Sequence, residues 1–291
     1  FDGVHVGHKK IINRLLKIAK KENLQAIVLT FFPHPRMVVQ KDTDIKMLNT
    51  IDEKNKLMEA EGIDHLVVKK FTKQFSRLSA QDYVIEVLVE TLHVKHIIIG
   101  YDHHFGRNRT ANINDLKAFG EIYNFKVTEI SAEEIDEVTV SSTKIRKALL
   151  DGDVKTANTF LGYNFMLTGK VVKGKGLGKQ LNYPTANIRI EEPYKLIPKN
   201  GVYVVKAIIK DAIVFGMMNI GTNPTVDGKV QSIEVHFFNF NQDIYGKILE
   251  VEILERLRDE QKFDSLEDLK NQLSKDFMNS ISLFFSGFII I

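Results

Sequence analysis

The hydrophobic pattern of this chain changes near residue 165, and that change limits the folds that the chain can adopt. Before residue 165, short apolar runs alternate with segments whose apolar residues have helical spacing. This pattern predicts a parallel α/β sheet, because parallel strands are covered on both faces by the helices that connect them. After residue 165, apolar and polar residues alternate as in half-buried strands. We therefore expect a second domain, an antiparallel barrel or sandwich.

The first half contains four apolar runs of strand length, at 25–31, 64–68, 96–100 and 126–130. Helical spacing predicts helices at 9–22, at 79–92 with Ser79 as the N-cap, and at 141–162, which connects the two halves. Ligands of parallel sheets bind at the carboxyl ends of the strands. The turns at 5–8, 33–35 and 100–102 follow expected strands or open a helix, and we expect them to share one cleft.

The second half contains five alternating runs, at 168–172, 202–209, 213–219, 233–238 and 248–254. A closing helix is expected from Ser265, its N-cap, to about Phe277. We place the two domains at 1–162 and 163–280 and interpret 281–291 as an atypical apolar tail. No strand precedes the glycine turn at residue 3, so we expect the first strand of the parallel sheet to be missing.

The composition excludes several function classes. A net charge of +3 over 291 residues gives no reason to expect a nucleic acid or an acidic membrane as partner. The chain has no cysteine, which excludes a disulfide framework and thiolate chemistry and suits a reducing cytoplasm. No apolar run reaches the roughly 18 residues that a membrane helix needs. We expect small-molecule partners in the cytoplasm, and the sequence does not give the oligomeric state.

The tetrapeptide His5-Val6-Gly7-His8 stands where a helix begins. A helix N-terminus offers unpaired N–H groups to phosphate oxygens, Gly7 allows close approach of the backbone, and imidazoles add further donors. These features predict a nucleoside triphosphate site. Two alternatives remain open at this point: half of a zinc site completed by His or carboxylate ligands, or a histidine pair without a function.

A second phosphate-binding candidate begins the connecting helix. Ser141, Ser142 and Thr143 stand at the helix start, and Lys144 and Arg146 follow within one turn. Such hydroxyls often cap a helix and do nothing more. With the two cations, the same helix start becomes a receptor for polyphosphate. An HxGH turn followed late in the domain by this helix resembles the nucleotidylyltransferase superfamily.

The loop after the third strand contains two arginines, Arg107 and Arg109, behind Gly106. They are either solvated loop charges or ligand-binding groups at a strand end. The preceding Asp102-His103-His104 also matches the short DHH motif of a metal-dependent phosphoesterase family. The other metal-binding aspartates of that family have no clear counterparts in this chain, so this alternative is weaker.

Three features of the second half indicate phosphate chemistry. The turn at 174–179 is rich in glycine, and the segment from Pro184 places Thr185 and Asn187 on one face if the segment is extended. Hydroxyl and amide oxygens suit Mg²⁺ and phosphate, although a satisfied turn would explain them equally well. Glu234 stands inside an apolar strand, where a carboxylate is costly unless it is paired with a cation or functional.

Together these motifs resemble the bacterial bifunctional riboflavin kinase/FAD synthetase family. In the first half the resemblance rests on FDGVHVGH, FFPHPR, GYDHHFGRNR and VSSTKIRKAL. In the second half it rests on GKGLGKQLNYPTANI, NIGTNPTV, EVHFFNFNQDIYG and LRDEQKF. They follow the family's order over about residues 1–278. Lys179 and Asn182 depart from the family's Arg and Gly, and Lys cannot form the bidentate fork of Arg.

The resemblance implies a Rossmann-like nucleotidylyltransferase domain, a riboflavin kinase-like barrel, and the conversion of riboflavin to FMN and of FMN to FAD, both with ATP. Implied catalytic residues are His5, His8 and, as general base, Glu234. Implied ATP and phosphate ligands are Gly7, Ser141, Ser142, Thr143, Arg146, Gly174, Gly176, Gly178 and Lys179. Implied flavin ligands are Asp102, Phe105, Arg107 and Arg109, and Thr185 and Asn187 are the implied Mg²⁺ ligands. The alternative is an FMN adenylyltransferase whose barrel binds flavin without kinase activity.

Overall fold

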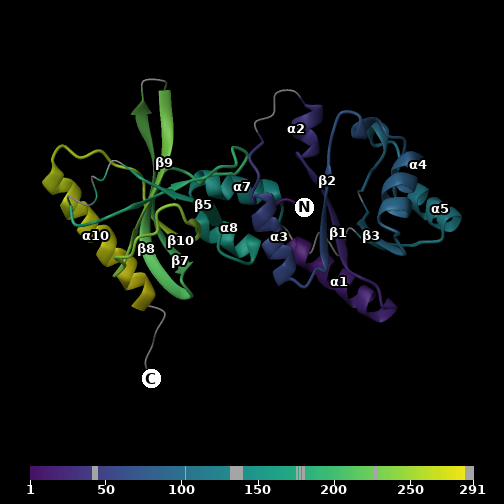
Figure 1. Cartoon of the computed structure of the whole chain (residues 1–291), viewed down its shortest axis with the longest axis horizontal. Helices are drawn as coiled ribbons and strands as arrows, with labels where there is room; N and C mark the ends of the chain where they lie inside the picture. The colour runs from purple at the N-terminus through teal and green to yellow at the C-terminus, as the bar shows by residue number, and fades with distance from the viewer. Residues whose placement is uncertain are drawn as a thin grey trace. The chain divides into compact units, whose positions relative to one another are not determined.

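The computed structural model describes residues 1–40, 45–101, 103–131, 140–174, 176, 178, 181–225 and 228–285, without the side chains of 223–230 and 284–285. It divides into two compact units, Phe1–Ser141 and Ser142–Ile291 (Figure 1). Two of the predicted site residues, Asp102 and Lys179, lie outside the described residues. Among the residues that are described, no helix is long and apolar enough to cross a membrane.

The first unit alternates helices with parallel strands, as predicted. Its strands are β1 (Ile27–Phe32), β2 (His65–Lys70), β3 (His96–Gly100) and β4 (Lys126–Ile130). Its helical segments are α1 (Val6–Glu22), α2 (Pro35–Val39), α3 (Ile51–Ala60), η1 (Phe75–Arg77), α4 (Ala80–Tyr83), η2 (Val84–Thr91), η3 (Arg107–Arg109) and α5 (Ile113–Tyr123). In the described residues β1 pairs with β2 and β3 pairs with β4, both parallel, as two two-stranded sheets.

Two apolar clusters form the core of this unit. One joins α1 and α3 to β1 through buried residues that include Ile12, Val28 and Met58. The other packs Leu88, Phe105 and neighbouring side chains around β3 and β4. Ser79 caps α4 as predicted, since its hydroxyl accepts the N–H of Asp82 at 3.0 Å. The helix expected at 79–92 changes form within its length, because Val84–Thr91 is π-helical.

The second unit is a closed antiparallel barrel preceded by two helices and followed by one. Its helices are α7 (Ser142–Asp151), α8 (Val154–Leu161) and α10 (Leu266–Phe285). Its strands are β5 (Met166–Val172), β6 (Ala186–Arg189), β7 (Gly201–Ile209), β8 (Ala212–Thr225), β9 (Gly228–Phe237) and β10 (Ile248–Arg258). Around the barrel the order is β10-β5-β6-β9-β8-β7. The alternating pattern left a barrel or a sandwich open, and the structure confirms the barrel that the family resemblance implied.

The structure differs from the sequence-based expectation at three places in this unit. The single helix expected at 141–162 is two helices, because Gly152 has a φ of 87° and Asp153 caps α8. The segment containing Asn187 forms β6, a strand that the alternation did not predict. The closing helix begins after its predicted cap, Ser265, but continues to Phe285, so that 281–285 are helical and not a tail.

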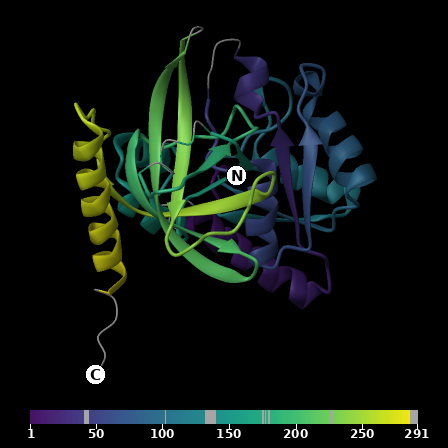
Figure 2. The ribbon, with the colours of Figure 1, turned by 60° about the vertical axis from the view of Figure 1, so that its left-hand side comes forward.

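A buried ion pair attaches α10 to the barrel, and Figure 2 shows this helix running alongside the barrel strands. The Asp276 side chain on α10 is 1% exposed and accepts hydrogen bonds from the Arg258 guanidinium of β10 at 2.7 to 3.1 Å. Gln272, one turn earlier, donates to the same carboxylate at 2.9 Å. Charges that are removed from water in this way are stabilising only while both partners remain.

We therefore expect Asp276→Ala to destabilise the second unit by about 3 kcal/mol, because it leaves the Arg258 guanidinium half-buried without its partner. Urea unfolding followed by circular dichroism measures this cost. Glu191→Ala is the matched control, since it breaks an ion pair with Arg189 whose side chains are 59% and 60% exposed. Similar, small losses of stability in both variants would contradict the interpretation.

Candidate functional site

The two histidines of the HxGH turn lie together at the N-terminus of α1. His5 is the N-cap of the helix, and its Nδ1 accepts the backbone N–H of His8 at 3.4 Å. The Nδ1 of His8 donates to the Gly3 carbonyl oxygen at 3.0 Å. The two rings stack with their centroids 3.7 Å apart. Because Nδ1 of His5 is an acceptor, the neutral ring carries its proton on Nε2, which remains able to donate to a ligand.

Burial keeps both imidazoles neutral. His5 is 6% exposed, and burial lowers its pKa to about 4. Burial also lowers the pKa of His8 well below its usual range, and the neighbouring His5 adds to this effect. An anion bound beside the rings would favour their protonated forms. The pair is therefore a group that can gain positive charge when phosphate binds.

One buried charged group near this turn, Lys54, escaped the sequence analysis. Lys54 on α3 is 2% exposed, and burial lowers its pKa while the charge of Asp2 opposes that shift. The Asp2 carboxylate accepts the N–H of Leu48 at 2.9 Å. His34 caps α2 by accepting the N–H of Arg36 at 3.3 Å, and burial lowers its pKa. The detectable signal was the capping box of α3, which Thr50 and Glu53 complete, but nothing in its spacing distinguishes Lys54.

The predicted flavin ligands occupy different environments. Phe105 is 7% exposed and packs in the core, with its ring centroid 5.8 Å from that of Tyr83. Arg107 and Arg109 are exposed in the short turn η3. Gly106 precedes them with a φ of 72°, and a Cβ there would lie 2.9 Å from the backbone of Ala80. The close approach of this loop to α4 thus requires glycine and presents the arginines to solvent.

The hydroxyl-rich helix start belongs to the second unit. Ser141 ends the first unit, whereas Ser142, Thr143 and Arg146 lie on α7. Ile145 is fully buried and anchors α7 in the core, while Thr143 is exposed. The sequence analysis assigned both phosphate-binding candidates to one domain. In the structure, the HxGH turn at α1 falls in the first compact unit and the start of α7 in the second.

In the barrel, the strand register gathers the predicted metal and base residues. Asn187 of β6 and Asn219 of β8 both stand opposite Glu234 of β9. Residues opposite each other on neighbouring strands share a face of the sheet. The Thr185 hydroxyl donates to Glu234 Oε2 at 3.3 Å. Thr185, Asn187, Asn219 and Glu234 thus form one polar group.

This group lies on the outer face of the barrel. Ile233 and Val235, which flank Glu234, are buried in the interior, so the carboxylate points the other way and is half-buried. Among the described residues, no Lys or Arg forms an ion pair with Glu234. In the described part of the chain, the Glu234 carboxylate contacts the Thr185 hydroxyl and forms no ion pair.

Gly174 and Gly178 of the glycine-rich segment lie directly against these side chains. A Cβ at Gly174 would overlap the side-chain amide of Asn187, and one at Gly178 would overlap the Tyr183 carbonyl and touch Thr185. Gly176 has a φ of 74° and open space around it. A side chain at 174 would therefore displace the Asn187 amide, one at 178 would clash with the backbone, and the positive φ at 176 favours glycine. The structure brings Gly174, Gly178, Thr185, Asn187 and Glu234 together.

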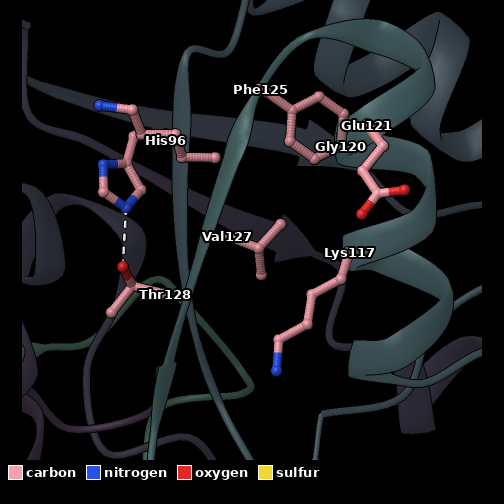
Figure 3. A pocket seen from close by; sticks show the side chains of 8 residues that line it. His96, Lys117, Gly120, Glu121, Phe125, Val127 and Thr128 are labelled. Carbon is pink, nitrogen blue, oxygen red and sulfur yellow. Dashed lines mark hydrogen bonds between the residues drawn. The ribbon is translucent and has the colours of Figure 1, made fainter.

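A separate pocket of about 460 Å³ lies in the first unit, at the amino ends of β3 and β4 (Figure 3). His96 bridges the Glu22 carboxylate at 3.1 Å and the Thr128 hydroxyl at 2.7 Å, and Lys126 also contacts Glu22, at 2.8 Å. These groups satisfy one another and attach the end of α1 to both strands. The pocket lies at the end of the strands opposite to the one where α/β sheets bind ligands, so we interpret this cluster as structural.

The metal alternatives gain no support from the described residues. Within them, no group of three or more His, Asp or Glu side chains could hold a metal ion. The zinc interpretation of the His5–His8 turn therefore lacks a complete ligand set in that part of the chain. Asp102, on which the phosphoesterase alternative depends, lies outside the described residues.

Both units match known families. The FAD synthetase family model matches residues 1–144, and the riboflavin kinase family model matches residues 161–284. The chain thus combines a nucleotidyltransferase-type α/β unit with a kinase-type barrel.

The names of curated relatives state both activities. The chain is 38% identical to the bifunctional riboflavin kinase/FMN adenylyltransferase of Listeria monocytogenes, over 98% of this chain and 90% of the relative. It is 38% identical to that of Buchnera aphidicola from Acyrthosiphon pisum, over 96% and 89%, and 34% identical to that of Escherichia coli K12, over 98% and 90%. The chain belongs to the family of bifunctional riboflavin kinase/FMN adenylyltransferases.

A solved structure also resembles this chain closely. The crystal structure described as a macrolide-efflux protein from Streptococcus pneumoniae has a TM-score of 0.86 and 34% identity, and covers 96% of this chain and 91% of its own. That description names a different activity from the one that both family models and the curated relatives name. We take from it the likeness of fold.

The buried His5 predicts a pH dependence of stability. An unfolded imidazole binds its proton near pH 6.5, whereas folded His5 does so only near pH 4. The folded state is the weaker proton binder, so its stabilisation is present above about pH 6.5 and is lost as the pH falls toward 4. We expect His5→Asn, which keeps an N-cap acceptor, to reduce the loss of thermal stability between pH 7.5 and 5. His65→Gln, at an exposed histidine, should not reduce it. Equal pH dependence in both variants would contradict the expectation.

Proposed function

We propose that this chain makes FAD from riboflavin by two phosphorus transfers, each catalysed mainly by the residues of one unit. Riboflavin and ATP give FMN and ADP, and FMN and a second ATP give FAD and pyrophosphate. Family membership supports the pair of activities. The observation that carries the chemistry is the contact of Thr185 with Glu234 beside the glycine-rich segment.

In the adenylyl transfer, an oxygen of the FMN phosphate attacks the α-phosphorus of ATP and pyrophosphate leaves. The attacking oxygen already carries charge, so no general base is needed. His5 donates from Nε2 to the developing charge on pyrophosphate, and His8 becomes a donor at Nε2 as the anion raises its pKa. Lys54 adds a buried ammonium near the same turn. Gly7 and the N–H groups of α1 bind phosphate oxygens.

Further ligands of this site are those that the resemblance implies. Ser141, Ser142, Thr143 and Arg146 stay predicted ATP and phosphate ligands. The exposed Arg107 and Arg109 bind the phosphate of FMN. Phe105, which is buried in the core, supports the loop that carries these arginines. Asp102 stays a predicted flavin ligand.

In the kinase reaction, the ribityl 5′-hydroxyl attacks the γ-phosphorus of ATP and ADP leaves. This hydroxyl is a weak nucleophile, and Glu234 accepts its proton. The N–H groups of the 174–178 segment bind the ATP phosphates, and Lys179 remains a predicted ligand there. Thr185 and Asn187 provide the hard oxygen ligands that suit Mg²⁺, which would neutralise phosphate charge when bound.

The alternative is a barrel that binds flavin without phosphorylating it. The packing of Gly174 and Gly178 against Thr185 and Asn187 favours the kinase, since simple flavin binding does not require a phosphate-binding segment against a carboxylate. A cytoplasmic location stays a prediction.

We expect His8→Ala to lower FAD formation from FMN by about 10²–10³-fold, because the variant loses a donor to charge that develops in the transition state. FMN formation from riboflavin should be nearly unchanged, since Thr185 and Glu234 lie in the other unit. Separating FMN and FAD after incubation with riboflavin, ATP and Mg²⁺ measures both reactions on one sample. An equal loss of both in a folded variant would show that the two sites are not separable.

We expect Glu234→Gln to lower riboflavin phosphorylation by about 10²–10⁴-fold, because glutamine keeps the volume and a hydrogen bond but cannot accept the hydroxyl proton. FMN supplied directly should still be converted to FAD. If Glu234 had only a structural role, the variant would melt at a lower temperature and keep its turnover within a few-fold. A folded and nearly fully active variant would remove Glu234 from the mechanism.

A further inference from the structure

His236 lies two residues after Glu234 on β9, and the two side chains therefore share the outer face of the barrel. Its Nδ1–H donates to the carbonyl oxygen of Pro184 at 2.8 Å. Pro184 immediately precedes Thr185, whose hydroxyl contacts Glu234. The strand that carries the carboxylate thus also holds the backbone of the segment that carries the hydroxyl.

The ring of His236 is fixed by aromatic neighbours. Its centroid lies 5.2 Å from that of Tyr183 and 5.9 Å from that of Phe238, both at steep angles. The Tyr183 hydroxyl is 3.1 Å from that of Ser274 on α10. Burial lowers the pKa of His236, so the neutral ring has one N–H, and a carbonyl partner requires that proton on Nδ1.

The direction of the Pro184 carbonyl is linked to the orientation of the peptide bond that leads into Thr185. The proline ring fixes φ at Pro184, so rotation about ψ is the backbone freedom that remains before Thr185. A hydrogen bond to the carbonyl oxygen fixes that rotation, and with it the plane of the peptide that joins Pro184 to Thr185. The bond from His236 therefore acts on the one backbone rotation that precedes Thr185, whose hydroxyl contacts Glu234.

We propose that His236 is a positioning residue for riboflavin phosphorylation, which acts by holding the Pro184 carbonyl so that Thr185 stays against Glu234. The inference rests on the kinase reaction proposed for the second unit. His236 does not touch the reacting atoms. Its removal should therefore lower kcat and raise the Mg²⁺ concentration needed for half-maximal rate, with little change in the KM for riboflavin.

Two substitutions separate the hydrogen bond from the packing of the ring. His236→Phe keeps an aromatic ring against Tyr183 and Phe238 but cannot donate to Pro184. His236→Asn loses the ring but places an amide N–H close to the position of Nδ1. Since a displacement of about 1 Å can cost about 10²-fold in rate, we expect H236F to lower kcat of FMN formation by about 10–10²-fold. We expect H236N to stay within a few-fold of the unsubstituted chain.

Conversion of FMN to FAD by the same samples is the internal control for protein concentration, and circular dichroism of each variant is the control for folding of the barrel. Unchanged kinase kinetics in H236F would overturn the proposal. A greater loss of kcat in H236N than in H236F would also overturn it, because that result would assign the effect to packing of the ring. Failure of the kinase assignment itself is a different result. In that case the unsubstituted chain would form no FMN, or E234Q would be fully active.

Discussion

The hydrogen-bond register of the closed barrel is the constraint on which the candidate site of the second unit depends. Pairing of β6 with β9, and of β9 with β8, places Asn187, Glu234 and Asn219 in one row. Side chains alternate between the faces of a strand, so a slip by one residue would turn Glu234 into the apolar interior and expose Ile233 or Val235. The free energy gained by burying the apolar face therefore fixes the register, and the register holds Asn187, Glu234 and Asn219 in a row on the other face. The same register aligns His236 with the Pro184 carbonyl.

The first unit holds its polar groups by a different principle. The HxGH turn uses its own imidazole as the helix cap and stacks a second ring on it, so that the groups offered to phosphate also stabilise the start of α1. Burial keeps these rings neutral until an anion is present. The site thus avoids the cost of burying uncompensated imidazolium charge and can still gain charge with its ligand.

Two further clusters of charged side chains in the described residues have a structural role. Glu22, His96 and Lys126 satisfy one another at the end of α1, and Arg258 and Asp276 attach α10 to the barrel. What distinguishes them from the candidate sites is the balance of charge and hydrogen bonds within each cluster. The Glu234 carboxylate, in contrast, meets a hydroxyl, and Lys54 lies near the imidazole of His8 and the carboxylate of Asp2. A buried ammonium beside neutral imidazoles is a group that a phosphate ligand can neutralise, whereas a carboxylate beside a hydroxyl can accept a proton.

The sequence by itself determined the two fold classes, since the period of apolar residues decides between a covered parallel sheet and a half-exposed antiparallel one. It also determined β3 and β4 to the residue, and it predicted the residues of both candidate sites, of which the barrel register brings Asn187 opposite Glu234. Local pattern could not show β6, which has four residues and follows a proline, or the break at Gly152. It gave no sign that Lys54 is buried near the HxGH turn or that His236 holds Pro184. Only the tertiary structure decided these points, because burial and strand register arise from contacts between segments that are distant in the chain.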